Sequence, residues 1–194
     1  MFQLLFGLSQ IHEKNIIHRD LKPENVLFTE DNRVKICDFG SSKIITKKET
    51  SSTPYIVSRY YRAPELILGC TEYCGEIDIF AAGCIFVELF IKEPIFPGKL
   101  EGLQLFEHLS LLGTPNAGFF NKFSLTSKIT SLTDNLEYMY PADFEELLNN
   151  QKKYDSEFIT DAADLILKML KWEALERITA KDALEHDFFK KTLK

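Results

Sequence analysis

The sequence predicts a mainly α (α+β) domain, helical with a small β-hairpin region near its amino end. Three observations support this fold class. At 194 residues the chain fits one domain, and a domain of this size buries roughly 70% of its unfolded surface. Hydrophobic residues make up 45% of the sequence, as in ordinary globular proteins. From residue 75 onward, apolar residues recur mostly at helical spacing.

The first expected element is an amphipathic helix over residues 2–13, because Leu4, Leu8 and Ile11 share one helical face. Short apolar runs then predict three strands, and a polar turn at residues 30–32 joins the last two into a hairpin. These strands are expected at residues 16–18, 26–28 and 34–37.

Residues 41–62 are polar, basic and rich in Ser and Thr, which predicts a long surface loop. Five helices should follow, of which the first is the most buried. They are expected at residues 75–91, 100–112, 143–150, 157–172 and 180–188. Thr179 and Asp182 have the spacing of a capping box before the last one. Residues 116–142 show no clear period and receive no assignment.

The composition argues against several partners and compartments. A formal net charge of −6 gives no general attraction to nucleic acid or acidic membranes. The apolar run at residues 77–91 contains Asp78 and Glu88 and is shorter than the roughly 20 residues of a membrane span. Because the amino end lacks the features of a signal peptide, a cytoplasmic and/or nuclear location is expected. The four cysteines form no zinc-type pairs and are expected to be reduced.

Three motifs occur in a fixed order along the chain. Residues 18–25 read HRDLKPEN, residues 38–40 read DFG and residues 63–65 read APE. Together they resemble the catalytic loop, the metal-binding motif and the end of the activation segment of eukaryotic Ser/Thr protein kinases. The resemblance implies that residues 1–194 are the C-terminal lobe of a kinase domain whose N-terminal lobe is absent, with an activation segment at about residues 38–65.

The resemblance also implies a chemistry, with ATP and Mg²⁺ as cofactors. Phosphoryl transfer requires mainly positioning and charge stabilisation. Asp20 would orient the substrate hydroxyl, and Lys22 would face the transferring phosphate. Asn25 and Asp38 supply the oxygen ligands that Mg²⁺ prefers, and both belong to the nucleotide site.

Other roles follow from the same resemblance. Leu27 would form the floor under adenine and Cys37 would line the nucleotide pocket, although simple packing in the strands explains both residues as well. Asp78 would hydrogen-bond the backbone of the catalytic loop. Glu65 would form a buried ion pair with Arg177, 112 residues away, and so fix the end of the activation segment.

Further stretches resemble the glycogen synthase kinase (shaggy-like) family. They are YIVSRYYRAPELILG at 55–69, DFGSSK at 38–43, PIFPG at 94–98 and LGTP at 112–115. The dual-specificity, tyrosine-regulated kinases share the pattern of Tyr55 and Ser58 and remain the alternative family. In either case Tyr55 is the expected phosphorylation site of the activation loop.

The family resemblance also implies partners, which are protein substrates and scaffold proteins. Arg19 and Lys43 match residues that bind the phosphate of a pre-phosphorylated substrate, although Lys43 also fits a solvated loop lysine. Leu105 and Phe106 match apolar contacts for scaffold proteins, and packing within the domain is the alternative for both.

The expected function is that of a Ser/Thr kinase that transfers the γ-phosphate of ATP to proteins. The 194 residues contain neither a G-x-G-x-x-G loop nor a strand lysine of the V-A-I-K type. The isolated chain is therefore expected to be inactive. The alternative is a truncated, non-catalytic module that binds the partners of an intact kinase.

Overall fold

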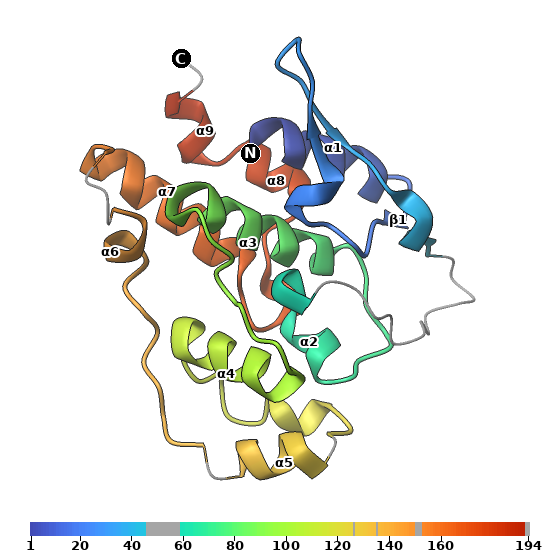
Figure 1. Cartoon of the computed structure of the whole chain (residues 1–194), viewed down its shortest axis with the longest axis vertical. Coiled ribbons are helices and arrows are strands. Elements are labelled where there is room, and N and C mark those ends of the chain that lie inside the picture. Colours follow the sequence, from blue (N-terminus) through green and yellow to red (C-terminus); the bar gives the residue numbers. More distant parts are fainter. Residues whose placement is uncertain (46–58, 126, 135, 150–152, 193–194) are drawn as a thin grey trace.

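The computed structural model describes residues 1–45, 59–125, 127–134, 136–149 and 153–192 (Figure 1). Helices account for most of the regular structure in these ranges. They are α1 (Phe2–His12), α2 (Pro64–Ile67), α3 (Glu76–Ile91), α4 (Glu101–Leu112), α5 (Ser127–Thr133), α6 (Phe144–Leu148), α7 (Ser156–Met169), α8 (Ala180–Leu184) and α9 (Asp187–Thr192). Short 3₁₀ turns are η1 (Pro23–Asn25), η2 (Phe39–Ser41), η3 (Arg59–Tyr61), η4 (Phe120–Lys122) and η5 (Ala174–Glu176).

The described strands form two small antiparallel sheets. They are β1 (Ile16–Ile17), β2 (Val26–Phe28), β3 (Val34–Ile36) and β4 (Lys43–Ile44). β2 and β3 form the expected hairpin, with Val26 opposite Ile36 and Phe28 opposite Val34. β1 pairs with β4, so that Ile17 lies opposite Lys43. This second pairing returns the chain after the DFG motif to the segment that precedes the HRD motif.

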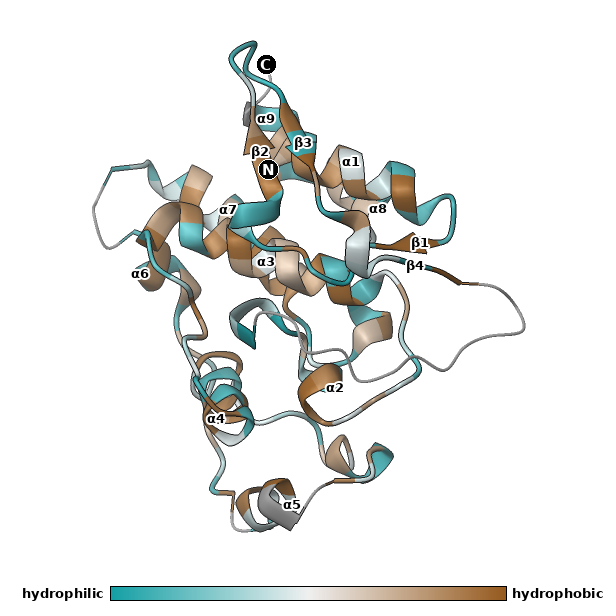
Figure 2. Cartoon of the chain, turned by 45° about the vertical axis from the view of Figure 1, so that its right-hand side comes forward, coloured by the Kyte–Doolittle hydropathy of each residue, from teal (hydrophilic) through white to brown (hydrophobic). Residues whose placement is uncertain are grey.

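Helix α3 lies in the middle of the molecule, where α7 and α6 pack against it (Figure 1). Eleven of its 16 residues are buried, more than in any other helix among the described residues. Hydrophobic residues run along α3 and the neighbouring face of α7 (Figure 2). Within the described ranges, no helix has both the length and the apolar character needed to cross a membrane.

Most predicted helices are observed with small shifts at their ends. The run at 75–91 forms α3, and the run at 157–172 forms α7. The predicted helix at 180–188 is instead two helices, because the chain turns after α8 and the His186 ring accepts a hydrogen bond from the Phe188 amide at 3.3 Å. Thr179 caps α8 as expected, by accepting a hydrogen bond from the Asp182 amide.

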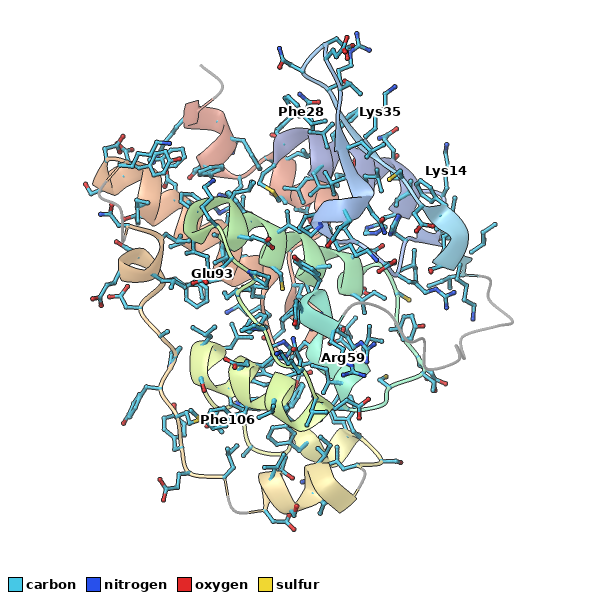
Figure 3. The ribbon with its side chains drawn as sticks, viewed as in Figure 1. Lys14, Phe28, Lys35, Arg59, Glu93 and Phe106 are labelled. Atoms are coloured by element: carbon cyan, nitrogen blue, oxygen red, sulfur yellow. The ribbon has the colours of Figure 1, made fainter. Side chains whose placement is uncertain are left out.

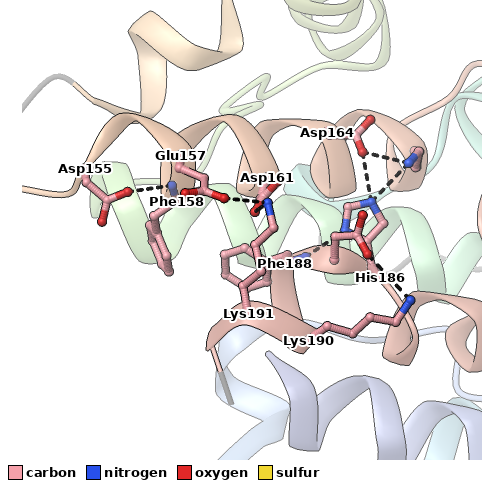
Figure 4. Close-up of polar contacts among 11 residues, drawn as sticks. Asp155, Glu157, Phe158, Asp161, Asp164, His186, Phe188, Lys190 and Lys191 are labelled. Atoms are coloured by element: carbon pink, nitrogen blue, oxygen red, sulfur yellow. Dashed lines mark hydrogen bonds and ion pairs between the residues drawn. The ribbon is translucent and has the colours of Figure 1, made fainter. Parts of the chain in front are cut away.

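The last helix, α9, is attached to α7 by charged contacts (Figure 4). The Lys191 ammonium lies 2.8 Å from carboxylate oxygens of both Glu157 and Asp161. The His186 ring nitrogen Nε2 lies 2.9 Å from the Asp164 carboxylate, beside Lys168. These contacts close the carboxyl-terminal helices against the helix that covers α3.

A buried ion pair joins two distant parts of the chain. Glu65 on α2 and Arg177 after η5 are each only 5% exposed. Both guanidinium nitrogens Nη1 and Nη2 donate to the Glu65 carboxylate at 2.7 Å. The remaining N–H groups of Arg177 donate to the backbone carbonyls of Lys171, Glu76 and Trp172. The arginine therefore has a partner for each of its five N–H groups, which offsets the cost of burying its charge.

A second polar feature lies where α4 meets the core. Leu105 and Leu109 of α4 belong to a satellite hydrophobic cluster, whereas His108 packs edge-on against Phe80 and Phe96 of the main cluster. His108 is fully buried, and neither ring nitrogen has a hydrogen-bond partner in the described part of the chain. Burial, together with the nearby Arg177 charge, lowers the pKa of His108 from 6.5 to about 3.

We expect Arg177→Met to lower the free energy of unfolding by about 3–5 kcal/mol, because the Glu65 carboxylate would remain buried without its partner. Urea denaturation measures this change. Lys190→Met is the control, because its ion pair with Asp187 is exposed and 3.5 Å long. A loss for Arg177→Met as small as that for the control, about 0.5 kcal/mol or less, would contradict the proposed cost of breaking the pair.

We expect His108 to make the fold sensitive to acid. Its pKa is lowered in the folded state, so the unfolded chain binds more protons and stability falls as the pH drops below 6.5. Between pH 7 and pH 5 this group should cost about 2 kcal/mol. His108→Leu should remove that part of the loss when urea unfolding is compared at the two pH values. Parallel pH profiles for the two proteins would argue against a buried neutral imidazole.

Candidate active site

The segment that contains the HRD motif is held by one carboxylate. Asp78 of α3 is 1% exposed and accepts hydrogen bonds from the backbone amides of His18 at 2.8 Å and Arg19 at 2.9 Å. The His12 ring nitrogen Nε2 donates to the same carboxylate at 2.9 Å. Arg19 has a φ of +69°, in the left-handed region that residues other than glycine rarely adopt. Asp78 therefore stabilises an unfavourable backbone conformation immediately before Asp20.

Asp20, Lys22 and Asn25 form a compact polar group. The Lys22 ammonium donates to Asp20 Oδ2 at 2.9 Å, and this hydrogen bond raises the pKa of Lys22. The Asn25 amide donates to the Asp20 backbone carbonyl at 2.8 Å and to Oδ2 at 3.3 Å. The other carboxylate oxygen, Oδ1, is buried and has no hydrogen-bond partner among the described residues. The group therefore holds a carboxylate in a fixed position beside an ammonium.

The hairpin brings the DFG motif to this group. The Cys37 amide donates to the Asn25 carbonyl at 2.9 Å, which places Asp38 one residue beyond the end of the ladder. The His18 ring nitrogen Nε2 donates to the Cys37 carbonyl at 2.8 Å. Asp38 is exposed, has a φ of +61° and accepts a hydrogen bond from the Gly40 amide at 3.3 Å. The two predicted metal ligands therefore come from adjacent ends of the same hairpin.

The donor atoms of Asn25 and Asp38 fit Mg²⁺ rather than a softer metal, because both side chains offer oxygen. In the ranges that the structure describes, no group of three or more His, Cys, Asp or Glu residues could hold a metal ion by itself. A cation at this site would therefore take its other ligands from water or from phosphate oxygens, which is the usual arrangement for Mg²⁺.

The two other predicted nucleotide contacts differ in burial. Leu27 is 49% exposed, and Phe28 beside it on β2 is exposed as well (Figure 3). Because Leu27 is exposed, packing in the strands does not explain why an apolar residue stands at this position. Cys37 is half-buried with a free thiol at the end of β3. Both residues lie on the hairpin that joins Asn25 to Asp38.

The predicted phosphate-binding residues come from neighbouring segments. The Arg19 guanidinium donates through Nε to the Ser41 carbonyl and through Nη1 to the Tyr73 hydroxyl at 3.4 Å. Lys43 is half-buried and lies opposite Ile17 in the pairing of β1 with β4. Tyr55 falls outside the described residues. Sequence reasoning missed the contacts of His12 and Tyr73, for which no motif gave a signal.

The predicted scaffold contacts behave differently from each other. Leu105 is only 1% exposed and packs in the satellite cluster, as the alternative of packing within the domain proposed. Phe106 is 54% exposed (Figure 3). It borders a groove of about 320 Å³ between α4, α5 and the segment that follows α5, and the other lining residues include Gly102, Leu132 and Met139.

The comparisons with known proteins give the family. The family described as "Protein kinase domain" matches residues 1–189 of this chain. The chain is 40% identical over 191 residues to Protein kinase gsk3 of Schizosaccharomyces pombe and 39% identical over 188 residues to Mitogen-activated protein kinase 10 of Arabidopsis thaliana. It is also 39% identical over 188 residues to Mitogen-activated protein kinase HOG1 of Saccharomyces cerevisiae.

Each of these alignments covers 97% of this chain, and they cover 46%, 45% and 41% of the respective relatives. The chain thus spans less than half the length of the curated relatives it matches. It belongs to the protein kinase family, and the similarity to these relatives supports a eukaryotic Ser/Thr kinase.

The family match corrects the predicted fold class, a C-terminal lobe with its N-terminal lobe absent. The match to the protein kinase domain extends over residues 1–189 and does not single out one lobe. That prediction was wrong because it treated motifs missing from these 194 residues as a statement about the architecture of the domain. The absence of these motifs from the 194 residues does not describe any other part of the protein.

We expect Asp78→Asn to loosen the catalytic loop, because an amide has one acceptor oxygen where the carboxylate uses two. Loss of these buried hydrogen bonds should lower stability by about 1–3 kcal/mol. The amides of His18 and Arg19 should also exchange their hydrogens faster, as measured by NMR. Asp187→Asn, at an exposed position, is the control. Unchanged exchange at both amides would mean that Asp78 does not hold the loop.

Proposed function

We propose that this chain is part of a Ser/Thr protein kinase of the glycogen synthase kinase type, which transfers the γ-phosphate of ATP to protein substrates. The observation that supports this most directly is the geometry of Asp20. Its carboxylate contacts Lys22 and Asn25 through one oxygen and keeps the other oxygen without a partner in the described structure. A carboxylate held in a fixed position beside an ammonium is what the hydroxyl of a protein substrate requires.

The roles of the other residues follow from their positions. Asp20 orients the hydroxyl and accepts its proton, and Lys22 places a positive charge beside the transferred group. Asn25 and Asp38 would hold Mg²⁺, which neutralises charge on the phosphates of ATP when bound. Leu27 would support the adenine ring, and Cys37 would border the nucleotide pocket.

The choice of the glycogen synthase kinase branch rests on sequence. The named relatives include glycogen synthase and mitogen-activated kinases at nearly equal identity. The stretch YIVSRYYRAPELILG favours the former, because cyclin-dependent and mitogen-activated kinases more often have Trp where Tyr60 stands. Tyr55 in this stretch is the proposed phosphorylation site of the activation loop. The expectation that the isolated chain is inactive stays a prediction.

The proposed substrates are proteins, including pre-phosphorylated ones whose phosphate binds Arg19 and Lys43. We assign scaffold binding to the groove beside Phe106, the exposed member of the predicted pair. Leu105 would contribute only to the base of that groove.

The decisive test is Asp20→Asn in the longest natural protein that contains this chain. Transfer of labelled phosphate from ATP to a general protein substrate should fall by about 10²–10⁴-fold, the usual contribution of a positioned acid or base. Asp31→Asn is the matched control, because Asp31 is an exposed aspartate in the hairpin turn. Equal activity of the two variants would refute the role of Asp20, and no transfer by the unaltered protein would refute the function.

A further inference from the structure

We propose that the hydroxyl of Tyr73 is a third donor of the phosphate site proposed above for Arg19 and Lys43. In this role Tyr73 would bind the phosphate monoester of a phosphorylated protein segment and help to select such substrates. The inference rests on the proposed function, since it adds a specificity residue to the same site. It is carried by the contact between Arg19 and Tyr73, two residues separated by 54 positions in the sequence.

Both the backbone and the side chain of Arg19 are held by hydrogen bonds. Its backbone amide is bound by Asp78, and its Nε donates to the Ser41 carbonyl. Its Nη1 donates to the Tyr73 hydroxyl at 3.4 Å. These contacts leave a long side chain with little freedom, so an anion that binds it loses less affinity to side-chain ordering.

The Tyr73 hydroxyl is available as a hydrogen-bond donor. Its oxygen accepts a hydrogen bond from the arginine, and in the described part of the chain its own proton has no acceptor. A cationic donor polarises the hydroxyl and makes it a better donor in turn. The half-buried ring packs against the main hydrophobic cluster, which keeps the hydroxyl in place beside the guanidinium.

Lys43 lies close to the same place in the fold. The pairing of β1 with β4 places Lys43 opposite Ile17, two residues before Arg19. Two cationic side chains and one neutral hydroxyl suit a phosphate monoester, whose charge approaches −2 near pH 7 and which offers three acceptor oxygens. Strong hydrogen bonds from several directions favour such a group over a singly charged carboxylate.

The first test measures binding without catalysis. Inorganic phosphate is titrated into the protein and followed by ³¹P NMR, for the unaltered chain and for Tyr73→Phe. We expect about tenfold weaker binding for Tyr73→Phe, the effect of losing one hydrogen bond to a charged group. Tyr154→Phe is the matched control, because Tyr154 packs against Phe90 and Phe158 far along the chain and should leave the affinity unchanged. Arg19→Gln should abolish the signal and so locate it at this site.

The second test measures phosphotransfer by the longest natural protein that contains this chain, with paired peptide sets in which a serine near the acceptor is either phosphorylated or unmodified. Tyr73→Phe should lower the ratio of kcat/KM for phosphorylated over unmodified peptides by about the same factor of ten, and Tyr154→Phe should not. Equal phosphate affinity in Tyr73→Phe and the unaltered chain would overturn the inference, as would binding that survives Arg19→Gln. Absence of transfer to any peptide would refute the proposed function instead, and the phosphate titration would still decide the role of Tyr73.

Discussion

The Asp78 carboxylate is the interaction on which the arrangement of the candidate site depends. It lies on the most buried helix, and its two oxygens together accept three hydrogen bonds from residues 12, 18 and 19. A carboxylate in such an apolar helix is costly unless its acceptors are used. Here the acceptors hold the backbone at Arg19, which has a left-handed conformation. Asp20 is the next residue in the chain. The cost of burying the charge and the strain at Arg19 are therefore offset by the same contacts.

The Glu65–Arg177 pair performs a similar function for the next part of the chain. It joins the APE motif to the loop before α8, and one N–H group of Arg177 also donates to the first residue of α3. A bidentate pair of this kind fixes both distance and orientation. The same helix thus positions the catalytic loop through Asp78 and the end of the APE segment through Arg177. The catalytic loop and the APE segment are therefore both held against α3, and the β2–β3 hairpin adds Asp38 to the candidate site.

The sequence was sufficient to predict contacts that follow from regular local structure. The hairpin is an example, since two apolar runs on either side of a polar turn predict the antiparallel pair that brings Asn25 next to Cys37. Contacts between distant residues without a motif were not predictable. His12 reaches Asp78 across 66 positions, and Tyr73 reaches Arg19 across 54, although nothing in the local sequence of either residue requires it. Leu105 and Phe106 are adjacent and both apolar, and only helix packing distinguishes the buried one from the exposed one.

The two sides of the candidate site differ in how firmly they are held. Asp20 and Asn25 are buried and hydrogen-bonded to each other, and Lys22 is bound to the same carboxylate. Asp38 is exposed, and in the described structure its carboxylate contacts only the amide of its own turn. Groups that must act on a reacting hydroxyl benefit from fixed positions, because misplacement lowers the rate steeply. A carboxylate that binds a hydrated cation benefits instead from oxygens that remain accessible. The difference in burial therefore matches the different tasks that phosphoryl transfer would assign to the two carboxylates.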